Sequence, residues 1–199
     1  MGKGTVTRER IIGRAVELAS VDGLNGLTLG RLAEGIGMSK SGLFAHFRSK
    51  EELQRSVLET TITSFRRFVY EPGAAEPRGE PRLRSIFERW LAWQQEREEM
   101  PGGCLLMQAS TELDDQPGPL RDLLVKAQRD WRDTLIAFAR GGITAGHFRA
   151  EVDPALFAFQ LEAIILGAGH DRRLLRDPLA LSHARAAFEA LLASARTTT

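Results

Sequence analysis

The sequence predicts an all-α protein of about nine helices. Two observations support this fold class along a chain of 199 residues. Apolar residues recur with helical spacing almost everywhere, and no stretch shows the alternation that is typical of a strand. Glycine and proline separate the periodic stretches from one another. Hydrophobic residues make up 43% and charged residues 27% of the chain, close to globular averages, which argues against a disordered protein.

The first fifty residues predict three short helices. An apolar stripe from Ile11 to Ala19 ends near Asp22-Gly23. A second stripe follows Thr28, a favourable N-cap residue, and comprises Leu29, Leu32, Ala33 and Ile36. Ser39 can cap a third short helix. We therefore expect a compact domain over residues 1–50.

A long helix and a linker are expected next. Ser49 and Glu52 form a capping box that opens a connecting helix over residues 51–70. The stretch Glu71–Pro81 holds three prolines and two glycines, and predicts a linker over residues 71–82. The remaining residues, 83–199, predict a second domain, with helices expected over residues 83–99, 105–113, 120–140, 153–175 and 177–195.

Composition excludes several classes of protein. The longest apolar stretch, Ala163–Gly169, is far shorter than the ~20 residues that span a bilayer. The N-terminal residues lack the pattern of a secretory signal. The single cysteine, Cys104, cannot form an internal disulfide or a multi-cysteine metal site. We expect a cytoplasmic protein that does not enter a membrane and needs no metal or cofactor.

Catalytic motifs are also missing. The sequence contains no nucleophile elbow, zinc-protease, phosphate-loop or dinucleotide-binding motif. The acidic pairs Glu98-Glu99 and Asp114-Asp115 are adjacent residues, and solvated carboxylates are the simpler interpretation. The sequence therefore argues against an enzyme.

Charge is distributed unevenly. Residues 1–50 carry eight Lys or Arg against four Asp or Glu, whereas residues 51–199 carry nineteen against twenty-two. A basic N-terminal region on a mildly acidic remainder indicates an N-terminus that faces a polyanion.

Residues 28–47 have the pattern of a helix-turn-helix, two short helices joined by a tight turn that contains glycine. Ala33 is small enough for the second helix to cross over it. Gly37 allows the backbone to turn without the steric cost of a Cβ atom. The polar residues Ser39, Lys40 and Ser41 begin the second helix, the end that reaches base edges in the major groove.

The segment GMSKSGLFAHFRSKEEL, residues 37–53, resembles the DNA-binding signature of the tetracycline-repressor (TetR) family of bacterial transcription regulators. The resemblance is close over residues 7–65. It implies a sequence-specific regulator, most commonly a repressor, that leaves a palindromic double-stranded operator when a small-molecule effector binds. It further implies a homodimer, with residues 83–199 as the ligand-binding and dimerisation domain.

The resemblance also assigns DNA contacts residue by residue. It implies that five residues face bases or adjacent phosphates, namely Ser39, Lys40, Ser41, Gly42 and Leu43. It implies that three more contact phosphates, namely Thr28, His46 and Lys50. Phe44 departs from the tyrosine of many relatives, whose hydroxyl reaches a phosphate. Phe44 cannot make that bond, which leaves packing against a sugar or a thymine methyl. Phe47 is expected in the core.

Effector and dimer residues are less well defined. The helices that line the effector cavity in relatives carry Trp90, Trp93, Met107, Gln108, Trp131, Phe138, Phe157 and Gln160. Each apolar member could equally be ordinary core, and the polar residues Gln108, Glu112 and Gln160 could instead be solvated or bridge helices. The dimer interface is expected to contain Ile164, Ile165, Gly167, His170, Ala184, Phe188 and Leu191. The alternative is that the last two helices simply pack inside one subunit.

A second function class remains open from the sequence alone. The chain could be a helical small-molecule-binding or interaction module whose helix-turn-helix no longer recognises specific DNA.

Overall fold

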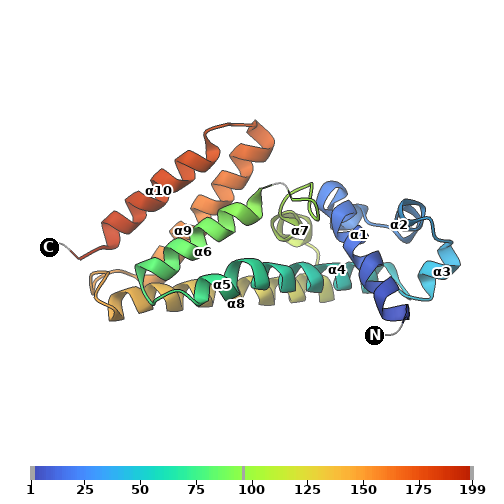
Figure 1. Ribbon diagram of the computed structural model, residues 1–199, viewed down its shortest axis with the longest axis horizontal. Helices are drawn as coiled ribbons and strands as arrows, with labels where there is room; N and C mark the ends of the chain where they lie inside the picture. The colour runs from blue at the N-terminus through green and yellow to red at the C-terminus, as the bar shows by residue number, and fades with distance from the viewer. Residues whose placement is uncertain (1–2, 96, 198–199) are drawn as a thin grey trace. The chain divides into compact units, whose positions relative to one another are not determined.

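The computed structural model describes residues 3–95 and 97–197 and confirms the all-α fold class (Figure 1). Within these residues there are ten α-helices and two π-helical turns, and extended pairing is limited to two isolated bridges. The elements are α1 (Lys3–Gly26), α2 (Leu29–Ile36), α3 (Lys40–Phe44), α4 (Lys50–Phe65), η1 (Arg66–Tyr70), α5 (Glu71–Ala74), α6 (Glu80–Gln94), α7 (Leu105–Leu113), α8 (Pro119–Thr144), α9 (Pro154–His170), η2 (Asp171–Leu175) and α10 (Ala180–Ala195).

The described residues divide into two compact units. The N-terminal unit comprises those within 1–65 and 95–127, and the C-terminal unit comprises 66–94 with 128–197. This division differs from the predicted boundary near residue 83, because α7 packs on α1 and α4, and residues 95–127 belong to the N-terminal unit. Glycine and proline mark where helices end, but they do not indicate which helix packs on which.

The expected linker over residues 71–82 contains the short helix α5 and the start of α6. Pro72 lies in the first turn of α5, where its missing N–H costs nothing. Gly73 is buried, and a Cβ atom there would lie 2.4 Å from Cδ1 of Ile86. This segment is thus a packed turn. The following helix, α6, begins and ends earlier than the expected 83–99.

The core of the N-terminal unit is formed by one face each of α1, α2 and α4, with α3 anchored on it. Buried side chains include Ile11, Ala15, Leu32, Leu53 and Val57. Burying each large side chain contributes about 1.5–3 kcal/mol. Phe47 is 0% exposed, and the guanidinium of Arg8 lies 4.9 Å from its ring centroid, so its expected place in the core is confirmed.

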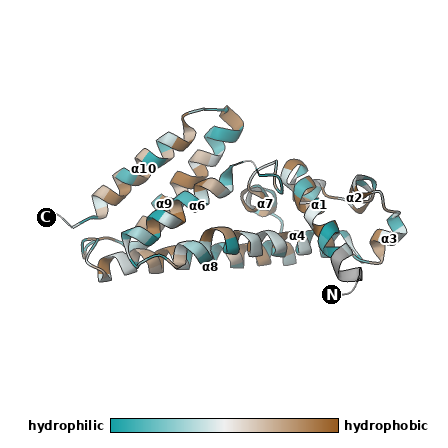
Figure 2. Cartoon of the chain, in the orientation of Figure 1, coloured by the Kyte–Doolittle hydropathy of each residue, from teal (hydrophilic) through white to brown (hydrophobic). Residues whose placement is uncertain are grey.

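The core of the C-terminal unit contains α6, α9 and α10. Phe87 of α6 stacks on Phe188 of α10 with ring centroids 3.9 Å apart. Figure 2 shows hydrophobic and hydrophilic residues intermixed along α6 and α10, as expected for helices with one buried and one exposed face.

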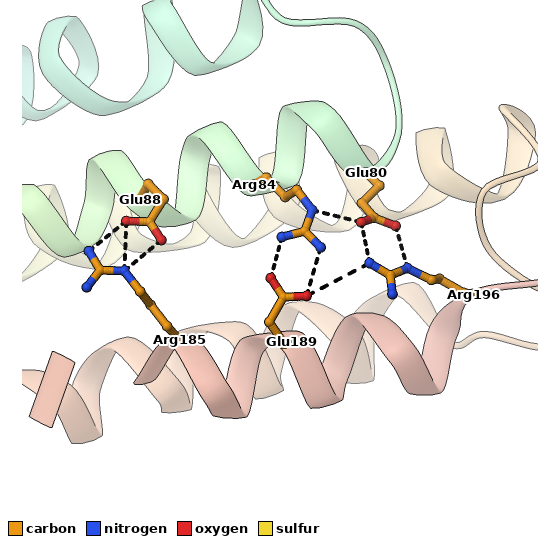
Figure 3. A network of polar contacts seen from close by, with 6 residues as sticks. All are labelled: Glu80, Arg84, Glu88, Arg185, Glu189 and Arg196. Carbon is orange, nitrogen blue, oxygen red and sulfur yellow. Dashed lines mark hydrogen bonds and ion pairs between the residues drawn. The ribbon is translucent and has the colours of Figure 1, made fainter. Parts of the chain in front are cut away.

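Ion pairs fasten the exposed edge between α6 and α10 (Figure 3). Glu80 of α6 receives hydrogen bonds from Arg196 at 2.7 and 2.9 Å and from Arg84 at 2.8 Å. Arg84 also donates to Glu189, and Arg185 donates to Glu88. The hydrogen bonds from Arg196 are the main reason why the pKa of Glu80 falls from its ordinary 4.5 to about 2.

A carboxyl group whose pKa is lowered on folding stabilises the protein above its unfolded pKa, and this stabilisation is lost as pH falls through the folded pKa. We therefore predict that Glu80→Gln lowers the free energy of unfolding at pH 7, and that the difference from wild type shrinks between pH 4.5 and 2. Urea unfolding across this range measures the effect. A difference that does not change with pH would contradict it.

Candidate nucleic-acid interface

The turn between α2 and α3 has the predicted geometry. Thr28 caps α2 with an extended backbone, and its hydroxyl oxygen accepts a hydrogen bond from the Arg31 N–H at 3.3 Å. Gly37 ends the helix in the left-handed region at φ 66°, where a side chain would cost energy. The Met38 N–H then donates to the Ala33 carbonyl at 3.0 Å and closes the turn.

Helix α3 exposes one face and buries the other. Ser39 caps it, accepting a hydrogen bond from the Gly42 N–H at 3.1 Å. Lys40, Ser41 and Phe44 are exposed, Phe44 by 50%. Leu43, which was expected to face DNA, is fully buried, so its side chain belongs to the core that docks α3.

The expected phosphate contacts flank α3. His46 is half-buried, whereas Lys50 is exposed at the start of α4 and donates to the Asn25 carbonyl at 2.7 Å. An ammonium group has three N–H donors, so this bond leaves donors for a phosphate. The Ser49 hydroxyl accepts from the Glu52 N–H, as the capping box predicts, but Glu52 accepts from the Arg48 N–H rather than from that of Ser49.

The expected effector residues fall into two groups. The C-terminal unit contains Trp90, Trp93, Trp131, Phe138, Phe157 and Gln160. Trp90 and Trp131 meet edge to face at 5.2 Å, and Phe138 stacks on Tyr70. Phe157 is buried beside Phe148, while Gln160 is exposed.

Met107 and Gln108 lie in the N-terminal unit. Both are half-buried on α7. The Gln108 amide donates to the carbonyls of Ser20 at 2.9 Å and Gly102 at 2.8 Å. Gln108 therefore bridges helices, one of the two alternatives considered for it.

Four of the expected dimer residues are buried within the chain, namely Ile165, Ala184, Phe188 and Leu191. Their side chains pack in the subunit's own core and offer no surface to a partner. Ile164 is half-buried, whereas Gly167 and His170 are exposed on α9. The same face of α9 exposes Leu156, Phe159 and Leu166, each by 51–59%. The sequence contained a signal for these three exposed apolar residues, because α9 is apolar on nearly all of its faces.

Among the described residues, no group of three or more His, Cys, Asp or Glu side chains could hold a metal ion. In the same part of the chain, no helix combines the length and the apolar character that crossing a bilayer requires.

Comparisons with known proteins agree with this geometry. A family model described as "Bacterial regulatory proteins, tetR family" matches residues 11–57, and one described as "Tetracyclin repressor-like, C-terminal domain" matches residues 79–188. The second match alone covers more than half of the chain. The chain belongs to the TetR family. It is accordingly a DNA-binding transcriptional regulator with a helix-turn-helix domain, as residues 28–50 predict.

Individual relatives resemble the chain to different extents. The tetracycline repressor protein class C of Escherichia coli is 39% identical over 56 residues, which are 28% of this chain and 26% of that protein. The chain thus matches about a quarter of that relative's length. A TetR transcriptional regulator from Chloroflexus aurantiacus has a TM-score of 0.87 and 27% identity, with both chains fully covered.

The regulator AibR, solved in complex with isovaleryl coenzyme A and operator DNA, has a TM-score of 0.75 and 18% identity. The match covers 93% of this chain and 97% of AibR. At that identity the likeness shows a shared fold.

Proposed function

We propose that this TetR-family regulator is a homodimeric repressor that binds a palindromic operator in the cytoplasm and is released by a small-molecule effector. The exposed face of α3 is the observation that carries the proposal. Lys40, Ser41 and Phe44 project from a helix that is fixed by the buried Leu43 on its other face and by the buried Phe47 just after its end. The proposal assigns the chain no catalytic activity and no cofactor.

The chemistry of this face suits the major groove. Lys40 can donate to the O6 and N7 acceptors of guanine, and Ser41 can donate to or accept from several bases. Thr28, Ser39, Gly42, His46 and Lys50 surround the face, and we assign to them contacts with the phosphate backbone or with neighbouring bases. Such contacts hold the helix in register without reading the sequence.

The exposed side of α9 supports the dimer. Leu156, Phe159 and Leu166 lie at helical spacing with Gly167 and His170, so one face of α9 presents apolar side chains to solvent. A second copy of this chain would cover that face in an isologous interface. A two-fold dimer places two copies of α3 against half-sites one helical turn apart, ~34–36 Å.

The effector would bind in the C-terminal unit. Trp90, Trp93, Trp131, Phe138 and Phe157 place aromatic rings on three of its helices, and aromatic side chains suit an apolar or flat ligand.

Selection from random duplexes tests the function. We predict that the protein enriches a two-fold symmetric sequence with half-sites about 10 base pairs apart. Lys40→Ala should change the preferred base within each half-site, whereas Lys126→Ala, which removes an exposed lysine on α8, should not. If the wild-type protein enriches no sequence, it is instead a helical module without specific DNA recognition.

Phe44 provides a second test. It lies four residues after Lys40, so both side chains project from the same face of α3, and we assign its ring to a thymine methyl. Covering one methyl is worth about 0.8 kcal/mol, or about fourfold in affinity. Replacing one operator thymine by deoxyuridine, which removes that methyl, should weaken wild-type binding by about this factor.

Variants of Phe44 complete this test. Phe44→Ala should bind the thymine and deoxyuridine operators equally, whereas Phe44→Tyr, which retains the ring, should still prefer thymine. If Phe44→Ala keeps the full preference for thymine, the ring does not read the methyl.

The dimer is tested by placing a charge on α9. Phe159→Glu should give a monomer at micromolar concentration in size-exclusion chromatography with light scattering, because burying an unpaired carboxylate opposes association. Ser64→Glu adds the same charge at an exposed position of α4 and should leave the dimer intact. A wild-type monomer, or a dimeric Phe159→Glu, would contradict this interface.

A further inference from the structure

The end of α1 is irregular where it leads into the helix-turn-helix. Gly23 has φ 79° and interrupts the helix, so the peptide groups that follow it lose their regular helical pairing. We call residues 23–27 the junction, because they connect α1 to Thr28, the N-cap of α2. Buried or half-buried peptide groups released in this way need partners elsewhere.

Helix α7 provides the partner for two of these N–H groups. The Glu112 carboxylate accepts from the Leu24 N–H at 3.0 Å and from the Asn25 N–H at 2.8 Å, one bond to each oxygen. Hydrogen bonds to an ionised acceptor are stronger than those between neutral groups. A Cβ atom on Gly23 would lie 2.4 Å from the nearer Glu112 oxygen, so glycine also leaves room for the carboxylate.

Helix α4 holds the carbonyl groups of the same residues. Gln54, which is buried, donates from its amide to the Leu24 carbonyl at 2.8 Å. Lys50 donates to the Asn25 carbonyl. The junction is therefore held from two sides, its N–H groups by α7 and its carbonyls by α4.

Helix α7 itself packs closely against α1. The Gly102 N–H, just before α7, donates to the hydroxyl of the buried Ser20 at 3.0 Å. A Cβ atom on Gly102 would lie 1.6 Å from the Ser20 carbonyl oxygen, so the two backbones are in contact. Gln108 adds its bonds to the carbonyls of Ser20 and Gly102. The end of α1 and the start of α7 are therefore joined by two hydrogen bonds and a direct backbone contact.

We propose that Glu112 is a positioning residue for DNA recognition, which fixes the orientation of the helix-turn-helix by tying the junction to α7. The inference rests on the proposed function. Glu112 touches no DNA in this scheme and acts through Leu24 and Asn25 on the start of α2. When the junction is attached to both α7 and α4, helix α3 has one orientation. When the attachment to α7 is lost and only that to α4 remains, the junction can rotate.

The test compares Glu112→Ala and Glu112→Gln with Asp115→Asn, which removes a charge three residues away on an exposed side chain. The first measurement is hydrogen exchange at the Leu24 and Asn25 amides, which reports local opening. We expect exchange at least tenfold faster in Glu112→Ala. The exchange rate in Glu112→Gln should lie between those of wild type and Glu112→Ala, because the single amide oxygen of glutamine can still accept from one N–H. Asp115→Asn should match wild type.

The second measurement is affinity for the selected operator and for versions with one base pair added or removed between the half-sites. Glu112→Ala should bind the selected operator about tenfold more weakly but lose much less affinity on the altered versions, so discrimination between spacings shrinks. An equal loss on all three operators, with a lower melting temperature, would indicate a merely structural role and overturn the proposal. Unchanged exchange and unchanged spacing discrimination would also overturn it.

The two proposals fail in different ways. If wild-type protein selects no operator, the regulator function itself is wrong. If wild-type protein binds its operator and discriminates spacing, and Glu112→Ala does the same, only the role of Glu112 is wrong.

Discussion

The burial of Leu43 and Phe47 is the interaction on which the DNA-reading surface depends. A helix of five residues is far too short to be stable alone, since helix nucleation costs more than a few hydrogen bonds return. These two side chains, both fully buried, attach α3 to the three-helix core. Their burial leaves Lys40, Ser41 and Phe44 on the outer face. The side chains proposed to read DNA thus lie on the exposed face, whereas the buried side chains of Leu43 and Phe47 hold that face in place.

The second constraint on the orientation of the helix-turn-helix is the set of helices that pack with it in the N-terminal unit. A helix-turn-helix of this size has a small core, and the structure enlarges it with α4 and α7. The contacts with α7 include hydrogen bonds donated by backbone N–H groups, from Gly102 to the Ser20 hydroxyl and from the junction to the Glu112 carboxylate. Directional bonds of this kind fix orientation more strictly than apolar packing does, because a hydrogen bond weakens steeply when it is bent.

Two kinds of interaction hold the helices of the C-terminal unit together. Inside, aromatic stacking between Phe87 and Phe188 joins α6 to α10. At the edge, Arg84 and Arg196 each form ion pairs with the carboxylates of Glu80 and Glu189 along the same two helices. Exposed ion pairs contribute little individually, but a network loses less side-chain entropy for each bond formed. The exposed apolar face of α9 is the surface that we propose for a second copy of the chain.

Local sequence was sufficient for the helix-turn-helix. The N-caps at Thr28 and Ser39, the left-handed glycine at Gly37 and the spacing of Leu32 and Ala33 are all short-range features, and each is where the sequence predicts it. The family resemblance, carried by residues 37–53, followed from the same short segment.

Long-range packing was decided only by the tertiary structure. Nothing near Glu112 indicates that its carboxylate would cap peptide groups 88 and 87 residues earlier in the chain, or that α7 would join the N-terminal unit. The sequence does not decide the place of Phe188 either, because a residue on an apolar stripe fits an interface or a core equally well. In the structure Phe188 stacks on Phe87, which places it in the core. Periodicity determines which face of a helix is apolar, but only the arrangement of the other helices determines what covers that face.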